Sequence, residues 1–464
     1  MKVFRKTWPR PKQSERALRK ARLLLQLLEA RDLPSTYYVA PTGSNSAAGS
    51  AAAPWQTLQQ AANTVQAGDT VHVAAGNYLG FNIVTDGTAA APITFQADAG
   101  AVINQPMYWG GIYFGINNSG HAYNVVDGFT MVAQPSDPLW DAGIRFGGTG
   151  TPGQWVQGGI IRNNIVHMRV VTPGDTSQNY DQFDIFTSWQ DGTLVQNNTV
   201  SGGWDSGIYM SNSAKNYVVQ NNTVFNVGGN GIHNNGDLSA GSPGINYNAL
   251  IEGNIIHDVC FGIGGQAISC DGVQDSRILN NLVYNSHSKG ISLFGQDAAQ
   301  GSQRDIVVNN TVLTAADGGS ALRMAANSPG NTVYDNVFYS NNTSAASFDL
   351  NSEDLVGLVS DYNVVTNRIY VDGSTVSFSS WKSNYHEDAH SLIATPTQLF
   401  ANSAANDYHL VAGSPAVDAG TATDAPATDI VGTPRPQGAG YDIGAYELPF
   451  AEAVIRVKSD PAFE

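Results

Sequence analysis

A short phrase recurs along the middle of the chain: an apolar pair, a polar residue, an Asn and then a β-branched pair. It reads Ile-Arg-Asn-Asn-Ile-Val at residues 161–166 and Val-Gln-Asn-Asn-Thr-Val at residues 195–200. The last Asn of each copy stands at Asn164, Asn198, Asn222, Asn254, Asn281, Asn310, Asn336 and Asn363, in steps of 34, 24, 32, 27, 29, 26 and 27 residues. Variable steps of this size are typical of stacked coils with loops of unequal length. Each copy is predicted to form one turn of a solenoid.

The residues beside each Asn indicate which solenoid. They are short β-branched segments separated by Gly, Asn, Asp and Ser, and they show no helical periodicity. This pattern predicts an all-β parallel β-helix. An Asn at a tight bend can hydrogen-bond the backbone and the Asn of the next coil, and it tolerates the left-handed conformation. The repeated Asn is therefore interpreted as scaffold.

Composition limits the classes of partner. The chain has 464 residues, 42% of them hydrophobic and only 13% charged, which favours one elongated unit. The net charge is −16, although residues 1–22 hold nine of the 23 Lys and Arg. An acidic body excludes nucleic acid and anionic membranes as partners of the folded part, and no apolar run is long enough to cross a membrane. We expect a monomer. Cys260 and Cys270, ten residues apart, could form a local disulfide or be small apolar fillers of the core, and the second interpretation is favoured.

The N-terminal part carries a family resemblance. It reads Tyr-Tyr-Val-Ala-Pro-Thr-Gly at residues 37–43, then Trp55 and Leu58 in a short helical stretch, then Gly-Asp-Thr-Val at residues 68–71. This order resembles the opening of right-handed parallel β-helix proteins of the pectate-lyase-like superfamily. The resemblance implies a right-handed solenoid that acts on polysaccharide. A helix from about residue 57 to 65 is expected to cover the first coil.

Both ends add further resemblances. Residues 414–447, with Ser-Pro-Ala-Val-Asp-Ala-Gly and a later Gly-Tyr-Asp-Ile-Gly-Ala-Tyr-Glu, resemble the choice-of-anchor Q region. The phrase Leu-Glu-Ala-Arg-Asp-Leu-Pro-Ser at residues 28–35 resembles a planctomycete-type leader, which implies a secreted or cell-surface protein. The expected layout is a basic leader (1–35), an N-terminal cap with the first rungs (36–115), the repeat region (116–370), a turn-rich C-terminal cap (371–450) and a tail (451–464).

Each coil has a second strand after the Asn phrase, in which an Ile or Leu is expected to face the core. Because side chains alternate along a strand, the next residue should face outward. The predicted outward column is Arg145, Phe186, Tyr209, His233, Ser269, Ser292, Arg323 and Asp349. Stacked rungs lie about 4.8 Å apart, so this column could contact one extended glycan.

Lyase chemistry on an acidic glycan is the first hypothesis. Such an enzyme removes the proton beside a uronate carboxylate, which needs a base and a group that neutralises the carboxylate. Lys289 and Arg323 are predicted to serve, with His233 as an alternative acid or base. Carboxylate oxygens are suited to Ca²⁺, and a calcium cluster is expected from Asp181, Asp184 and Asp205. No organic cofactor is expected.

Two alternatives stay open. A glycoside hydrolase would need paired carboxylates, and Asp205 with Asp184 or Asp271 could supply them. A non-catalytic carbohydrate-binding solenoid would use the same column. In each case sugar contacts are predicted for Tyr209, Trp204, Arg145 and Asp297, although Trp204 could equally fill a bend. The chain lacks the Trp-x-Asp-His and Arg-x-Pro-x-x-Arg signatures of the main pectate and pectin lyases, so any enzyme here belongs to another branch.

Overall fold

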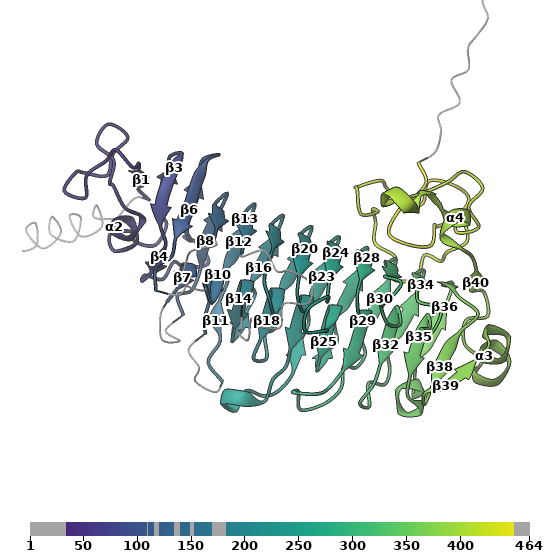
Figure 1. Cartoon of the computed structure of the whole chain (residues 1–464). Helices are drawn as coiled ribbons and strands as arrows, with labels where there is room; N and C mark the ends of the chain where they lie inside the picture. The colour runs from purple at the N-terminus through teal and green to yellow at the C-terminus, as the bar shows by residue number, and fades with distance from the viewer. Residues whose placement is uncertain are drawn as a thin grey trace, which may run out of the picture.

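The computed structural model describes residues 34–108, 110–115, 120–133, 140–148, 153–168 and 182–449. Three sheets of twelve strands each run the length of the molecule, and each complete coil contributes one parallel strand to each sheet (Figure 1). Near the C-terminal end, residues 369–371 and 374–376 form an antiparallel pair within one coil. The predicted parallel β-helix is therefore confirmed. Residues of the leader before 34 and of the tail after 449 lie outside the described residues, so the export implied by the leader stays a prediction.

The three sheets are named here in the order in which a coil visits them. Sheet 1 contains β1 (Thr36–Val39), β2 (Thr70–Val73), β5 (Ile93–Ala97), β8 (Asn124–Asp127), β12 (Ile160–Arg162), β16 (Leu194–Gln196), β19 (Val218–Gln220), β23 (Leu250–Glu252), β27 (Arg277–Leu279), β30 (Ile306–Val308), β33 (Thr332–Tyr334) and β36 (Val359–Asp361). Sheet 2 contains β3 (Gly76–Leu79), β6 (Ala101–Gln105), β9 (Thr130–Val132), β13 (Ile165–His167), β17 (Thr199–Ser201), β20 (Thr223–Val227), β24 (Ile255–Val259), β28 (Leu282–Ser286), β31 (Thr311–Thr314), β34 (Val337–Ser340), β37 (Val364–Val365) and β40 (Leu392–Ile393). Sheet 3 contains β4 (Phe81–Ile83), β7 (Gly110–Phe114), β10 (Ala142–Phe146), β14 (Phe183–Ser188), β18 (Ser206–Ser211), β21 (Asn230–Asn235), β25 (Gln266–Asp271), β29 (Lys289–Phe294), β32 (Leu322–Met324), β35 (Phe348–Leu350), β38 (Ile369–Val371) and β39 (Ser374–Val376).

Short elements complete the chain. Three two-stranded sheets pair β11 (Val156–Gln157) with β15 (Gln190–Asp191), β22 (Asn246–Tyr247) with β26 (Val273–Gln274), and β41 (Phe400–Asn402) with β42 (Asp407–Leu410). The described helices are α2 (Leu58–Ala62), α3 (Phe378–Tyr385) and α4 (Pro396–Leu399), with 3-10 turns η1 (Ser239–Gly241), η2 (Ser352–Leu355) and η3 (Ser403–Ala405). No helix in these described segments is long and apolar enough to span a membrane.

The repeated Asn forms a buried ladder between sheets 1 and 2. The Oδ1 of Asn254 accepts the backbone N–H and the Nδ2 of Asn222, each at 3.0 Å. Its own Nδ2 donates to Val219 O and to the Oδ1 of Asn281, both at 2.9 Å. The same bonds repeat from Asn164 to Asn363. The predicted scaffold role of these side chains is confirmed.

The residue before each ladder Asn makes the turn itself. It has a positive φ, for example 57° at Asn163, 55° at Asn197 and 53° at Asn280. Gly253 takes this position in one coil and Asp335 in another, with φ of 66° and 55°. The two asparagines of the phrase thus divide the work. The first adopts the left-handed conformation, and the second satisfies the buried backbone.

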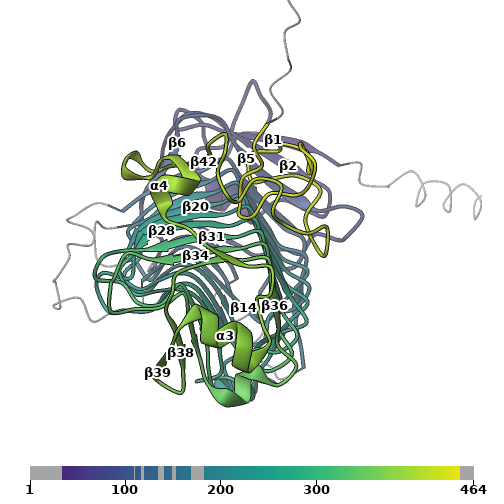
Figure 2. The ribbon, with the colours of Figure 1, turned by 90° about the vertical axis from the view of Figure 1, so that its right-hand side faces the viewer.

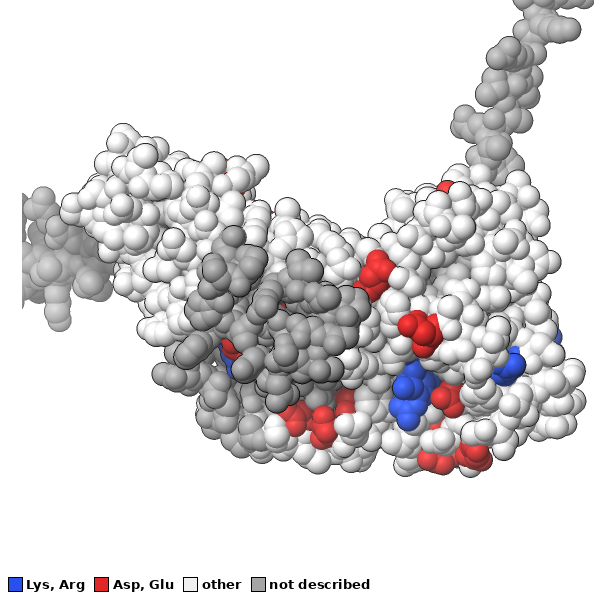
Figure 3. Space-filling model, viewed as in Figure 1, with Lys and Arg blue, Asp and Glu red and all other residues white. Residues whose placement is uncertain are grey.

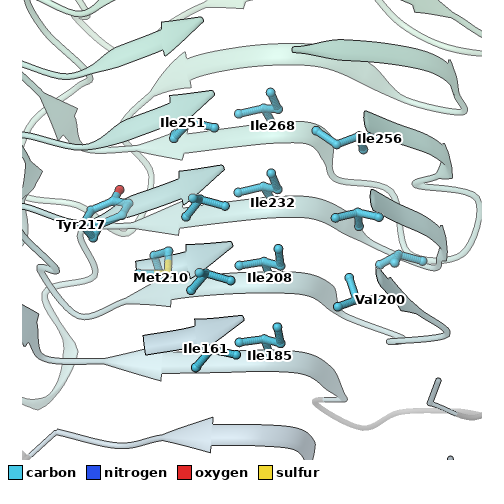
Figure 4. Packing of buried hydrophobic residues seen from close by; sticks show 14 of the residues in the cluster. Ile161, Ile185, Val200, Ile208, Met210, Tyr217, Ile232, Ile251, Ile256 and Ile268 are labelled. Carbon is cyan, nitrogen blue, oxygen red and sulfur yellow. The ribbon is translucent and has the colours of Figure 1, made fainter. Parts of the chain in front are cut away.

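The core is a set of aliphatic columns inside the coil. Ile185, Ile208, Ile232 and Ile268 lie one above another on sheet 3 and face Ile251 and Ile256 of the other sheets (Figure 4). All six side chains are fully buried. Each core side chain therefore packs against a side chain of similar type in the next coil, so the core of one coil is completed only by its neighbours.

Both ends of the solenoid are covered. At the first coil, α2 buries Leu58 and Ala61, and Thr57 caps it by accepting the N–H of Gln60 at 3.2 Å. The helix is shorter than the stretch expected from the sequence. At the last coil, α3 buries Trp381, whose Nε1 donates to Asp388 at 2.7 Å. Figure 2 shows α3 lying across the open end of the stacked coils.

The segment from residue 413 to 449 does not cover an end but lies along the ladder turns. Asn280 donates to the Thr428 carbonyl at 2.7 Å, and Asn309 donates to the Asp442 carbonyl at 3.0 Å. Arg435 and Glu447 form a fully buried ion pair at 2.8 Å. The left-handed asparagines therefore also hold the C-terminal segment. Cys260 and Cys270 are both free and buried, as expected for fillers.

Replacing one ladder residue should cost much more than replacing its neighbour. Asn254→Ala leaves the buried backbone N–H of Asn222 without an acceptor and removes one of the two hydrogen bonds of the Asn222 Nδ2, which keeps its bond to the Val195 carbonyl. We therefore expect a loss of about 3 kcal/mol in the free energy of unfolding. Asn221→Gly keeps the positive φ and serves as the matched control, with a loss below about 1 kcal/mol. Urea unfolding followed by circular dichroism measures both. Equal losses in the two variants would contradict the ladder's role.

Candidate functional site

The predicted outward column exists with the predicted register. Arg145 pairs with Phe186, Phe186 with Tyr209, and the pairing continues rung by rung to Asp349. The structure extends the column to Asn82 and Tyr113 before it and to Tyr370 after it. We call these residues the outer column: Asn82, Tyr113, Arg145, Phe186, Tyr209, His233, Ser269, Ser292, Arg323, Asp349 and Tyr370.

Alternation fails at the beginning of the same strands. A Cβ on Gly207 would lie 2.5 Å from the core side chain of Val224, so this position faces inward. The next residue, Ile208, also faces inward, so two successive residues point to the core. The residue before Gly207 faces outward again. These first residues form a second outward row, the edge row: Phe183, Ser206, Asn230, Gln266 and Lys289. The edge row and the outer column together make one polar face.

A neutral cluster lies in the middle of this face. The Tyr209 and His233 rings stack with centroids 4.3 Å apart and planes 4° apart. Asn235 Nδ2 donates to the Tyr209 hydroxyl at 2.9 Å, while His233 Nδ1 lies 3.5 Å from Ser206 Oγ and 3.4 Å from Asn230 Nδ2. Sequence reasoning missed Ser206, Asn230 and Asn235, because only the strand register reveals the edge row.

Burial controls the ionisation of this cluster. It lowers the pKa of His233 to about 4, although Asp237 opposes the shift, and it raises the pKa of Tyr209 to about 12. Both rings are therefore uncharged near neutral pH. Asp205 is half-buried beside them and accepts the Ser206 hydroxyl at 2.6 Å.

A cationic cluster lies farther along the face. Lys289 stands two rungs beyond Asn230 in the edge row, about 10 Å along the axis, and Arg323 follows Ser292 in the outer column. Burial lowers the pKa of Lys289, and the neighbouring Arg323 lowers it further, against the opposing effect of Asp349. The Arg323 guanidinium lies 5.9 Å from the Phe294 ring centroid. Figure 3 shows a small group of Lys and Arg side chains on this face with acidic side chains beside it.

These two cations differ from the other Lys and Arg of the described segments. Each of the others has a carboxylate or a backbone carbonyl as its partner: Arg145, Arg162, Lys215, Arg277, Arg304, Arg368, Lys382 and Arg435. Within the same segments, no ion pair or side-chain hydrogen bond joins Lys289 or Arg323 to an acceptor. The structure thus brings the predicted base and the predicted carboxylate neutraliser together, unpaired.

The predicted paired carboxylates are not free. Asp271 is buried, and its two oxygens accept the backbone N–H groups of Gln296, Asp297 and Ala298 at 2.7, 3.0 and 3.3 Å. It anchors that loop, on which Asp297 is exposed. Asp184 is fully buried at the inward-facing position, where burial raises its pKa well above the ordinary value. Sequence alternation had not indicated this inward position.

The expected calcium cluster does not fit these side chains. Asp181 lies outside the described residues, and Asp184 is fully buried, where burial raises the pKa of its carboxyl group and disfavours the charged form. Ca²⁺ takes ionised, accessible carboxylates. Among the residues that the structure describes, no group of three His, Cys, Asp or Glu is arranged to hold a metal ion.

Two predicted sugar contacts are held by the protein itself. Trp204 is only 4% exposed, and its ring lies against Gly228 and Gly262 at the bend between sheets 2 and 3, so it fills the bend. Arg145 pairs with Asp141 at 2.5 Å, and its guanidinium lies 4.3 Å from the Phe186 ring centroid. Tyr209 alone of the predicted sugar contacts lies in the central cluster.

The low pKa of His233 should make stability depend on pH. An unfolded chain protonates this ring near pH 6.5, whereas the folded chain resists protonation until about pH 4. The contribution that the neutral His233 ring makes to the free energy of unfolding above pH 6.5 is therefore lost as the pH falls from about 6.5 to about 4. We expect His233→Gln to make the loss shallower by an amount on the order of 2 kcal/mol. Urea unfolding from pH 7 to 4 measures it, with His390→Gln, an exposed ring, as control. Parallel curves for wild type and His233→Gln would refute the assignment.

Comparisons with known proteins agree with the fold. The model of the right handed beta helix region matches residues 110–299. Pectate lyase PEL9 of Emericella nidulans is 38% identical over 71 residues, which make up 15% of this chain and 17% of that protein. The solved structure of XylC with xylose has a TM-score of 0.51 at 13% identity, covering 89% of this chain and 99% of that one. Pectate lyase Pel9A has a TM-score of 0.47 at 17% identity, covering 91% and 98%. The chain is thus a right-handed parallel β-helix, and its chemistry has to be argued from the site.

Proposed function

We propose that this protein is a polysaccharide lyase that cleaves a uronate-containing glycan by β-elimination on the outward face of sheet 3. The observation that carries the proposal is the unpaired Lys289–Arg323 couple. A lysine whose pKa is lowered by burial and by a neighbouring cation is a better base near neutral pH than an exposed lysine. Asp349 lies next to Arg323 in the outer column, but no carboxylate in the described residues forms an ion pair with either cation. Two neighbouring cations without an ion-pair partner cost stability, which argues for a negatively charged ligand.

The reaction assigns one role to each cation. Arg323 neutralises the uronate carboxylate, which makes the adjacent C5 proton more acidic. Lys289 removes that proton, the C4–O4 bond breaks, and a C4–C5 double bond forms. The departing oxygen takes up a proton from the new lysine ammonium or from water. His233 is a weaker candidate for this work, because a ring with a pKa of about 4 is a poor acceptor of the C5 proton. We assign it, with Tyr209, to contacts with a sugar farther along the chain.

The hydrolase alternative has less support. A glycosidase needs two carboxylates on opposite sides of the bond. Asp184 faces inward and is sealed, and Asp271 is occupied by three backbone donors. Only Asp205 of the three candidate acids remains half-exposed. The local sequence similarity to a protein named pectate lyase points in the same direction as the lysine and the arginine. A polysaccharide substrate outside the cell is in keeping with the export implied by the resemblance of the leader.

Loss of Lys289 should abolish the reaction. We expect wild-type protein to produce absorbance near 235 nm from at least one acidic polysaccharide, tested on polygalacturonate, alginate and glucuronate-containing glycans. Lys289→Met should lower this rate by a factor of about 100 or more. Lys382→Met, in α3 at the far end of the solenoid, should keep it within about twofold.

The pH dependence provides a second readout in the same assay. Activity should rise as Lys289 loses its proton, with a midpoint below the ordinary lysine pKa. Unchanged activity in Lys289→Met would refute the lysine base. New reducing ends without absorbance at 235 nm would refute the lyase in favour of a hydrolase.

A further inference from the structure

Two serines of the outer column have a property that the proposed reaction does not use. Ser269 and Ser292 occupy consecutive rungs between His233 and Arg323. Both are fully buried, and neither hydroxyl oxygen has a hydrogen-bond partner among the described residues. Buried hydroxyls are nearly always paired, and an unpaired one costs about 1–3 kcal/mol. Two in succession call for an explanation.

Other serines on or beside this face find partners. Ser206 Oγ donates to Asp205 at 2.6 Å, Ser211 Oγ donates to Asn212 at 3.0 Å, and Ser286 Oγ donates to the Lys289 carbonyl at 2.9 Å. The strand geometry therefore does not prevent pairing. Among the buried serines that the structure describes, the two without a partner lie on the two rungs next to the unpaired cations.

The surroundings indicate what the hydroxyls would bind. Lys289 precedes Ser292 on the same strand, and Arg323 is the next residue in the column. Both cations are half-buried, and neither has a carboxylate within ion-pair distance among the described residues. Two hydroxyl donors beside two cations are complementary to a group that only accepts hydrogen bonds and carries negative charge. A carboxylate has these properties.

We infer that Ser269, Ser292 and Arg323 form a carboxylate-binding notch that selects the acidic sugar of the substrate. The identity of the ligand as a uronate rests on the proposed function. Both serines are closed to solvent, so a ligand reaches them only when the side chains that cover them move. The bound carboxylate accepts the two hydroxyl hydrogens and separates the two cations. Its C5 proton then lies on the side of Lys289.

The test uses binding, so that it does not depend on turnover. Trimers of galacturonate, mannuronate and glucuronate, and their methyl esters, are titrated calorimetrically into Lys289→Met protein, which leaves the trimers intact. Ser269→Ala and Ser292→Ala are added singly and together, and Ser211→Ala is the matched control because its hydroxyl already has a partner. Each alanine in the notch should weaken binding of the acidic trimer about tenfold. Methyl esterification should weaken binding in the parent, and it should weaken binding less in the double variant, in which only Arg323 still contacts the carboxylate.

Thermal unfolding separates recognition from folding. Removing an unpaired buried hydroxyl should leave the melting temperature of Ser269→Ala and Ser292→Ala unchanged or raise it, whereas Ser211→Ala should lower it slightly. Unchanged affinity in the double variant overturns the notch, as does a clear fall in its melting temperature or the absence of ester-sensitive binding to every trimer. Serine-dependent binding in a protein without activity at 235 nm would support the notch and refute the lyase. If the serine-to-alanine variants, made in the wild-type background, keep activity at 235 nm with an unchanged KM, the lyase is supported and the notch is refuted.

Discussion

One buried amide in each coil keeps the strands of this protein in register. The coils differ in length from 24 to 34 residues, yet each ladder Asn accepts two hydrogen bonds from the preceding one and donates to the next. The variation is therefore confined to loops, while the strands stack at the spacing set by the backbone. The outer column depends on this constraint. Residues from eleven different coils reach the same line only because no coil slips by one position, which would turn the column inward.

The sequence predicted the parts of the site that follow from period and alternation. Counting one residue forward from each core Ile placed Tyr209, His233 and Arg323 correctly. The residue before each core Ile could not be placed in the same way, because two successive residues face inward where the strand leaves the bend. Asp184, which precedes Ile185, is the first residue of such a pair. The surroundings of Trp204 and Asp271 could not be predicted either. They depend on glycines at a bend and on the loop after β29, whose conformation has no period.

Electrostatics explains how an acidic protein can recognise an acidic polymer. The net charge of −16 opposes association at long range, but charges separated by more than about 10 Å are largely screened at physiological salt. Near the outer column, Asp205, Asp237 and Asp271 all accept hydrogen bonds from the protein, which ties each carboxylate to a fixed position. Lys289 and Arg323 have no such tie. Recognition then depends on which local charges lack a partner, and the total charge matters less.

The two clusters on sheet 3 suit different parts of one glycan. Tyr209 and His233 are uncharged and stacked, whereas Lys289 and Arg323 are charged and unpaired, and about two rungs separate them. A polymer lying along the axis would place one sugar against the rings and another at the cations. The parallel pairing of the sheet 3 strands between the two clusters fixes this separation. If the proposed glycan binds both clusters, the spacing of the rungs limits which linkages can reach them, and the hydrogen bonds that hold the fold together would then set this selectivity.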